Sequence, residues 1–335
     1  MKHVKLLLAL IVVLLAGLAA GEMAMAQGKK KSTSKIPVKT EKPAAKRTPQ
    51  PKKEKKPAAK PRQEKKRDAD ENPRKVVERK PQPKPEPKPQ PKPEPKPEPK
   101  AEPALSNRTF TANGVSFTMV AVQGGTFTMG ATSEQGGDAH DDERPTHQVT
   151  LSSYYIGETE VTQELWQAVM GSNPSRFEGS NRPVEYVSWN DCQEFLSRLN
   201  RITGKRFRLP TEAEWEFAAR GGNLSKRYIH SGSNNINDVA WYNDNSGSTT
   251  HPVAIKQPNE LGIYDMSGNV WEWCSDWYGT YSSSAQSNPT GPSSGSNRVN
   301  RGGSWYYYAW GCRVSLRGSN SPDFRNFILG LRLAL

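Results

Sequence analysis

The sequence predicts an α+β domain with little regular secondary structure, preceded by a long segment that lacks core-forming side chains. Alternating apolar residues indicate strands soon after residue 105, and three capped helices follow before residue 222. The last third is rich in Gly, Asn and Ser, with Trp and Tyr interleaved, which is typical of packed loops and short strands. Because strands and helices do not keep alternating, a doubly wound sheet and an α/β barrel are excluded.

The charge of the chain is divided between two unlike parts. The whole sequence carries 47 Lys and Arg against 34 Asp and Glu, a net charge of +13. Residues 27–104 hold 26 basic and 11 acidic side chains, whereas residues 105–335 hold 19 and 22. The part able to fold is therefore mildly acidic, and we expect it to have no nucleic-acid partner.

The first 26 residues have the order of a secretory signal peptide. Lys2 and Lys5 precede an apolar run over 6–20, and Ala24-Met25-Ala26 is a small-residue cleavage site. A retained membrane anchor is the alternative, but the run is shorter than the roughly 20 residues that a spanning helix needs. We expect cleavage after Ala26 and export to a periplasm, a cell surface or the medium.

Residues 27–104 have a composition that predicts disorder: dense Lys, Pro, Glu and Gln, and no aromatic residue. Every second residue over 81–99 is proline, which favours extended polyproline II at about 3.1 Å per residue. We expect a stiff Lys/Pro-rich spacer in front of a folded domain over 105–335. The lysine-dense stretch 29–80 also suggests an electrostatic tether to anionic envelope polymers, and the two roles are compatible.

Three strands and three helices are predicted at the start of the folded domain. The strands cover 115–120, 126–129 and 149–156. Thr162 is expected to cap a helix over 163–170, and Thr211 begins a capping box with Glu214. Ser188 precedes a helix with one apolar stripe, formed by Cys192, Phe195, Leu196 and Leu199.

Residue types give no support for hydrolytic or zinc chemistry. The chain has no His-Glu-x-x-His, no Cys-x-x-Cys and no phosphate-binding loop. The segment 291–295 matches Gly-x-Ser-x-Gly but lacks the flanking strand and helix, which favours a serine-rich loop. The patch from His140 to Glu143 is rich in metal-ligand types. Four consecutive side chains rarely face one ion, so we expect a solvated acidic loop.

One further segment carries ligand chemistry. Asn269 and Glu272 lie three residues apart, beside Gly268 and between tryptophans. An amide oxygen, a carboxylate and backbone carbonyls are the hard ligands that calcium accepts. The alternative interpretation is an asparagine turn in which the glutamate pairs with a buried arginine. Residue types alone do not decide between the two.

Three motifs follow one another along the folded domain. Together they resemble those of the formylglycine-generating enzyme family, also called the sulfatase-modifying factor family. They are Phe-Arg-Leu-Pro-Thr-Glu-Ala-Glu-Trp-Glu over 207–216, the run over 259–273 that ends in Gly-Asn-Val-Trp-Glu-Trp, and Arg-Gly-Gly-Ser-Trp over 301–305. The resemblance covers nearly the whole folded domain. It implies a fold related to C-type lectin-like domains and a structural calcium ion held by Asn269, the Val270 carbonyl and Glu272.

Oxidases of this family convert the cysteine of a Cys-x-Pro-x-Arg motif to formylglycine, using copper(I) on two cysteines spaced Cys-x4-Cys. Without a gap, Tyr307 stands at the first copper position and Cys312 at the second. Matching Arg313 and Arg317 to the family's arginines requires a three-residue deletion and removes Cys312 as well. Either way a thiolate is missing, and copper(I) prefers thiolates. We therefore expect no copper.

The three cysteines allow one intramolecular bridge. Cys192 lies on an apolar helix stripe, where a free core thiol is expected. An exported protein forms disulfides readily, and Cys274 follows the presumed calcium loop. We therefore predict a Cys274–Cys312 bond, which would make Cys312 structural.

Two functions fit these observations. The favoured one is a non-oxidase binding or scaffold module of the cell envelope, whose aromatic loops bind an extended peptide or a glycan. Most of these rings are expected in the core, but three consecutive tyrosines cannot all face inward. The alternative is a formylglycine-generating-type oxidase acting on cysteine in target proteins, with Cys312 and Ser304 as catalytic candidates. The rings concerned are Trp273, Trp277, Trp305, Tyr306, Tyr307, Tyr308 and Trp310.

Overall fold

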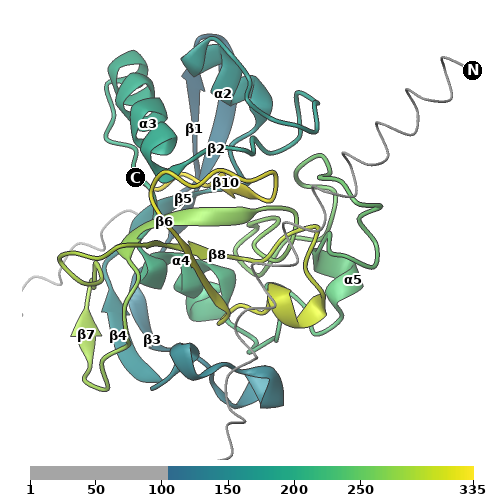
Figure 1. Ribbon diagram of the computed structural model, residues 1–335. Coiled ribbons are helices and arrows are strands. Elements are labelled where there is room, and N and C mark those ends of the chain that lie inside the picture. The colour runs from purple at the N-terminus through teal and green to yellow at the C-terminus, as the bar shows by residue number, and fades with distance from the viewer. Residues whose placement is uncertain (1–104) are drawn as a thin grey trace, which may run out of the picture. The chain divides into compact units, whose positions relative to one another are not determined.

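A computed structural model describes residues 105–335 of the chain (Figure 1). The predicted signal peptide over 1–26 and the predicted spacer over 27–104 lie outside the described residues. Within 105–335, no helix is both long and apolar enough to cross a membrane.

The first sheet is antiparallel and is covered by two helices. Strands β1 (Arg108–Ala112), β2 (Val115–Val122) and β5 (Tyr154–Gly157) lie in the order β1-β2-β5. Helices α2 (Gln163–Met170) and α3 (Trp189–Thr203) pack beside β1 and β2 (Figure 1). One apolar cluster joins these elements, and within it the rings of Trp166 on α2 and Phe195 on α3 stack with 4.8 Å between centroids.

The three predicted helix starts are confirmed. The hydroxyls of Thr162, Ser188 and Thr211 each accept a hydrogen bond from the backbone N–H three residues further on. These bonds satisfy N–H groups that have no partner inside the helix. The predicted stripe of α3 is buried as expected. Helix α4 (Glu212–Ala219) differs from a surface helix because all eight of its residues are buried.

The central sheet crosses the middle of the domain and packs against α4 (Figure 1). Its order is β10 (Leu329–Leu331), β6 (Trp271–Trp277), β8 (Arg298–Arg301) and β9 (Arg317–Asn320). Strands β10 and β6 run parallel, and the other neighbours are antiparallel. Glu272 therefore lies on a buried strand rather than at the centre of a loop.

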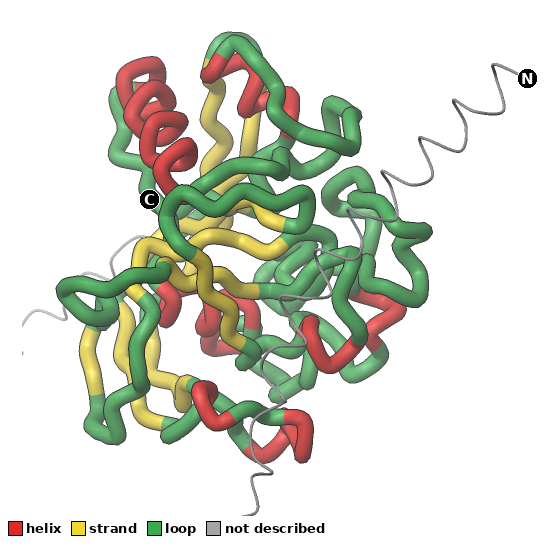
Figure 2. The backbone as a smooth tube through the Cα atoms, viewed as in Figure 1, coloured by secondary structure: helices red, strands yellow, loops and turns green. Residues whose placement is uncertain are grey.

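A third, smaller sheet contains β3 (Gly125–Met129), β4 (His147–Leu151) and β7 (Gln286–Ser287). Long loops connect these sheets (Figure 2), interrupted only by short helical turns. The predicted α+β class with few regular elements is confirmed. The turns are η1 (Ser133–Asp138), η2 (Asp141–Glu143), η3 (Gly222–Leu224), α5 (Ile236–Val239) and η4 (Ala309–Cys312).

Two predictions about the strands need correction. The single strand predicted over 149–156 was wrong, because β4 and β5 belong to different sheets and the chain turns between them. Asn288 Oδ1 accepts the N–H of Ser152, and Ser153 Oγ accepts the N–H of Gly124, so hydrogen bonds to distant loops hold this turn. Strand β1 was missed, since most of its residues are exposed or half-buried.

The acidic patch was also misjudged at Glu143. We expected a solvated loop, but this side chain is completely buried and pairs with Arg313, with 2.6 Å between Arg313 Nη2 and Glu143 Oε1. Arg313 lies 170 residues further along the chain, so no local pattern around Glu143 indicates this partner. The flanking residues His140 and Asp141 are exposed, as expected.

Buried arginines connect the irregular segments throughout the domain. Each is nearly inaccessible to water, and each donates to a glutamate on another element. All four also donate to backbone carbonyls, most of them in loops and short helical turns. These ion pairs are Arg301 with Glu212 and Glu216, Arg313 with Glu143, Arg317 with Glu212, and Arg332 with Glu272.

The Glu143–Arg313 pair predicts a specific stability change. Burial alone would raise the pKa of Glu143, but hydrogen bonds from Arg313, the His140 N–H and Ser315 lower it to about 2. A carboxyl with a lowered pKa stabilises the fold above its unfolded pKa, so this contribution is lost as the pH falls from about 4.5 towards 2. Glu143→Gln should lower the free energy of unfolding at pH 7 by about 3–5 kcal/mol, because Arg313 loses its counter-charge.

Urea unfolding at pH 7, 4.5 and 3 measures this effect. The difference in the free energy of unfolding between the variant and the parent protein should become smaller as the pH falls. Glu194→Gln is the control, because Glu194 pairs with Arg198 on an exposed helix face. Exposed pairs contribute at most about 1 kcal/mol. Equal losses for the two variants would contradict the role given to Glu143.

Candidate functional site

A continuous row of aromatic rings lies over the central part of the domain. Neighbouring rings along it are 5.4 to 6.4 Å apart between centroids, in the order Phe177, Trp305, Tyr306, Tyr307 and Trp310. Tyr306, Tyr308 and Trp310 are 46%, 57% and 41% exposed, so the prediction that the tyrosine run reaches the surface is confirmed. We call this surface the aromatic face, formed by Phe177, Trp305, Tyr306, Tyr307, Tyr308 and Trp310.

Some of the aromatic side chains predicted to bind a ligand are buried rather than exposed at the surface. Trp305 is 5% exposed, and its indole N–H donates to the Phe327 carbonyl. Trp273, predicted to border the same site, is completely buried and donates to the Val187 carbonyl. Burying one ring of the row and exposing its neighbours fixes the exposed rings on a rigid base. The expectation that most of the seven aromatic side chains belong to the core was wrong, because only Trp273 and Trp305 are buried.

Backbone geometry shapes the loop that carries the aromatic face. Gly303 has a φ of +75°, and a Cβ there would lie 2.4 Å from the Gly311 carbonyl oxygen, so only glycine allows the loop to close this tightly. The Trp305 N–H then donates to the Asn269 carbonyl, 2.8 Å away. The motif over 301–305 therefore holds the aromatic loop against the motif over 259–273.

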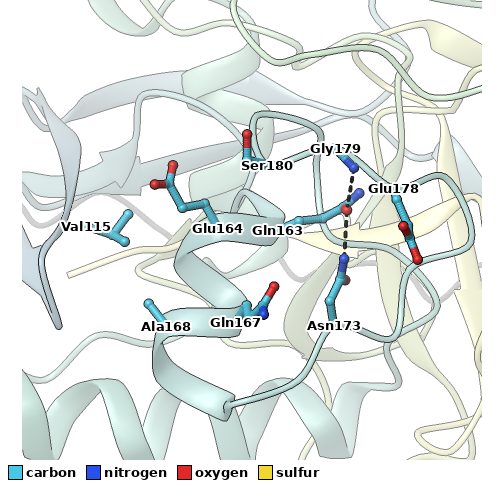
Figure 3. A pocket seen from close by; sticks show the side chains of 9 residues that line it. All are labelled: Val115, Gln163, Glu164, Gln167, Ala168, Asn173, Glu178, Gly179 and Ser180. Carbon is cyan, nitrogen blue, oxygen red and sulfur yellow. Dashed lines mark hydrogen bonds between the residues drawn. The ribbon is translucent and has the colours of Figure 1, made fainter.

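A polar hollow of about 560 Å³ lies beside α2 (Figure 3). At its centre, Gln163 Oε1 accepts hydrogen bonds from Asn173 and from the Gly179 N–H. Gln163 Nε2 donates to the carbonyl of Phe177, the first ring of the aromatic face. One buried amide thus fixes the loop over 173–179, and the sequence analysis did not find it because a single glutamine carries no motif.

The two positions of the copper cysteines do not fit copper(I). Tyr307 is half-buried, and its phenol is a hard donor. Cys312 is completely buried, and the backbone N–H of Ser304 donates to its sulfur. Burial raises the pKa of the Cys312 thiol to about 12, so it stays protonated at neutral pH. A metal that prefers a pair of thiolates finds one phenol and a single thiol here.

The predicted Cys274–Cys312 disulfide was wrong, because all three cysteines are free and buried. Cys274 lies on β6 and packs in the cluster around α4. Cys312 lies on η4 and packs with Ile236 and Tyr242 in a separate small cluster. The two thiols face different parts of the core. Cys192 is a free core thiol, as predicted.

The three predicted calcium ligands lie together at the start of β6. Asn269 has a φ of 55°, and its Oδ1 accepts the N–H of His251, so its amide shapes the loop. Glu272 accepts two hydrogen bonds from Arg332 and one from the indole of Trp215. The structure therefore contains the arginine pair of the alternative interpretation.

Two further buried carboxylates lie next to these residues, and the sequence analysis missed both. Asp265 Oδ2 accepts the Ala254 N–H, but Oδ1 is buried without a partner among the described residues. Burial and the neighbouring acidic groups raise the pKa of Asp265 to about 6, and they raise the pKa of Glu160 well above its usual range. Three carboxylates thus share the single cation Arg332. Asp265 lies in the motif over 259–273, which was the available signal.

This fold and this arrangement of motifs define a class of protein. Residues 107–335 match the model of the "Sulfatase-modifying factor enzyme 1-like domain" family. The chain therefore belongs to this family, which contains the formylglycine-generating enzymes, as the resemblance implied.

Individual relatives give a mixed picture. The "Chaperone protein LppX" of Paenibacillus barcinonensis is 36% identical over 241 residues, covering 57% of this chain and 79% of the relative. The "Formylglycine-generating enzyme" of Streptomyces coelicolor is 34% identical over 283 residues, covering 64% of this chain and 88% of the enzyme. Both an enzyme and a protein with a non-enzymatic name are thus similar to this chain.

Two solved structures have the same fold. "Treponema denticola variable protein 1" superposes with a TM-score of 0.62 at 38% identity, covering 70% of this chain and 99% of that one. PvdO from Pseudomonas aeruginosa gives a TM-score of 0.58 at 26% identity, with the same coverage. Both match the folded domain almost over their own full length.

Proposed function

We propose that this protein is a non-oxidase binding or scaffold module of the formylglycine-generating enzyme family. The observation that carries the proposal is the change at the two copper positions. Where copper(I) requires two thiolates, this chain has Tyr307 and the single buried thiol of Cys312. The loop between them bears exposed aromatic side chains, which suit binding rather than metal chemistry.

The ligand we propose is an extended polypeptide. Tyr and Trp provide large, rigid contact areas and are enriched where binding energy concentrates. The row of rings suits a long ligand, and Arg176 lies 4.9 Å from the ring centroid of Phe327 at one end, where it can contact carbonyls. One relative is named a chaperone protein, which favours a polypeptide over a glycan.

Removing two exposed rings should weaken binding. Reduced, carboxymethylated α-lactalbumin is a suitable unfolded probe, and fluorescence anisotropy reports its binding. We expect Tyr306→Ser with Trp310→Ser to lower the affinity at least about tenfold, because truncated hot-spot aromatics typically cost 2 kcal/mol or more. Leu224→Ser is the control, since Leu224 is 61% exposed and lies outside the aromatic face. Unchanged affinity in the double variant would contradict a polypeptide site on this face.

The same preparation tests the alternative, a formylglycine-generating-type oxidase acting on protein cysteines. A Cys-x-Pro-x-Arg peptide incubated with the protein and copper(I) should remain unmodified by mass spectrometry. Formylglycine that appears with the parent protein and disappears in Cys312→Ala would overturn the binding-module proposal. If the peptide does not react, the oxidase alternative loses its support, and the anisotropy experiment alone tests the binding function.

We also propose that a structural calcium ion binds at the start of β6. The unpartnered oxygen of Asp265 and the excess of carboxylates over Arg332 support it, since a divalent cation would balance their charge. Asp265, the Val270 carbonyl and Glu272 would hold the ion. Asn269, the remaining predicted ligand, would orient the loop through His251.

Calcium should raise the thermal unfolding temperature, and EGTA should reverse the change. Free calcium at a hundred times its Kd stabilises the fold by about 2.7 kcal/mol if it binds only the folded state. Asp265→Asn should raise the calcium concentration needed for the same rise in unfolding temperature at least about tenfold. Asp323→Asn, at an exposed position, should leave that concentration unchanged. A parent protein whose unfolding temperature ignores calcium would refute the site.

Export to the cell envelope is the last part of the proposal. Its support is the order of basic, apolar and small residues over 1–26, followed by the Lys/Pro-rich composition over 27–104. The basic segment would then act as a spacer or bind anionic envelope polymers. Mass spectrometry of the protein from its own cells should find a mature N-terminus at Gln27. Recovery of intact Met1 would contradict cleavage.

A further inference from the structure

A second hollow, of about 320 Å³, lies where the loop after β6 crosses the sheet of β3, β4 and β7. It shares no residue with the aromatic face. Its walls combine apolar and ring side chains with hydroxyl groups, the ion pair of Glu212 with Arg317, and a second carboxylate, that of Asp276. Among the lining residues are Met129, His147, Asp276, Tyr281, Pro289 and Thr290.

Asp276 is the unusual member of this hollow. Only 4% of the residue is exposed, yet it forms no ion pair with any residue of 105–335. Its Oδ2 accepts the Glu212 N–H at the start of α4 and the Ser275 hydroxyl. Its Oδ1 accepts no hydrogen bond from the described residues, and the side chain lines the hollow.

Glycine keeps the approach to this oxygen open. Gly291 lines the hollow with a φ of +72°, and a Cβ there would lie 3.2 Å from Asp276 Oδ1. Any other residue would place a methyl group or more against the carboxylate. Because residue 291 is glycine, no side chain fills the space beside Asp276 Oδ1.

The neighbouring ion pairs do not supply a cation for Asp276. Arg220, Arg301 and Arg317 are matched in number by their acidic partners, which are Glu134, Glu212 and Glu216. Arg298 donates to the Ser275 carbonyl and lies over the ring of Trp277 instead. Asp276 thus has no ion-pair partner among the described residues, with Arg298 acting on it only through longer-range attraction, and burial together with Glu212 raises its pKa to about 7.

We propose that this hollow binds a primary ammonium group on an aliphatic stem, with the ammonium at Asp276 Oδ1. A single free oxygen suits a compact point charge, whereas a guanidinium requires two oxygens for its fork. The hydroxyl of Thr290 offers a further acceptor, and Met129 and Pro289 offer apolar contact for the stem. Such a group occurs on a free alkylamine and on a lysine side chain.

Isothermal titration of the full chain at pH 8, where Asp276 is ionised, tests the proposal. The probes are n-butylamine and the peptide acetyl-Gly-Lys-Gly-amide, and the uncharged n-butanol is the negative control. We expect an amine to bind and n-butanol not to bind. The tighter of the two amines identifies the source of the ammonium. Equal heats for butanol and both amines would overturn the proposal.

Two variants locate the site. Asp276→Asn retains an oxygen for the Glu212 N–H while it removes the charge, so the fold should persist and amine affinity should fall at least tenfold. Gly291→Ala keeps the carboxylate but blocks Oδ1, and it should produce the same loss. Glu164→Gln, at the hollow beside α2, is the matched control and should bind like the parent. Unchanged amine affinity in Asp276→Asn or in Gly291→Ala would refute the site.

Discussion

Buried ion pairs between arginine and glutamate are the interaction on which this domain depends. Its strands are short and its loops are long, so backbone ladders cannot fix most of the chain. The guanidinium groups of Arg313 and Arg317 each combine a glutamate with backbone carbonyls of loops and short helical turns, which satisfies polar groups outside the sheets. Removing either partner leaves a buried charge behind, and this is why such pairs enforce one arrangement of the loops.

That framework explains how the same fold can hold either a reactive centre or a binding surface. The motif glycines, Trp305 and the backbone of Asn269 fix the path of the loop over 303–312 whatever side chains it displays. In the function we propose, Tyr307 takes the place of a copper thiolate and exposed rings are added, while the support of the loop stays the same. A family domain can therefore lose the metal site and keep a shaped, rigid surface for a partner.

The distribution of buried charge points to ligands as well as to stability. Where carboxylates and arginines match, as around Glu143 and Glu216, the structure is complete without a ligand. The carboxylates around Asp265 outnumber their arginine, and Asp276 has none. Because a buried uncompensated charge is unfavourable, we propose cations at both places, calcium at the first and an ammonium at the second. The two assignments rest on different residues and stand or fall separately.

The sequence by itself determined the α+β class, the family, the three capped helices and the likeness of the last third to packed loops. These follow from local signals such as hydroxyl caps, apolar periodicity and contiguous motifs, which act within a few residues. Only the tertiary structure decided which carboxylates meet arginines. Glu143 and Arg313 are 170 residues apart, and Cys274 and Cys312, expected to bond, pack in separate clusters. The exposure of the aromatic face and the position of Asp276 beside its hollow were likewise decided by long-range packing. Segments far apart in the sequence determine whether a side chain is buried, paired or open to a ligand.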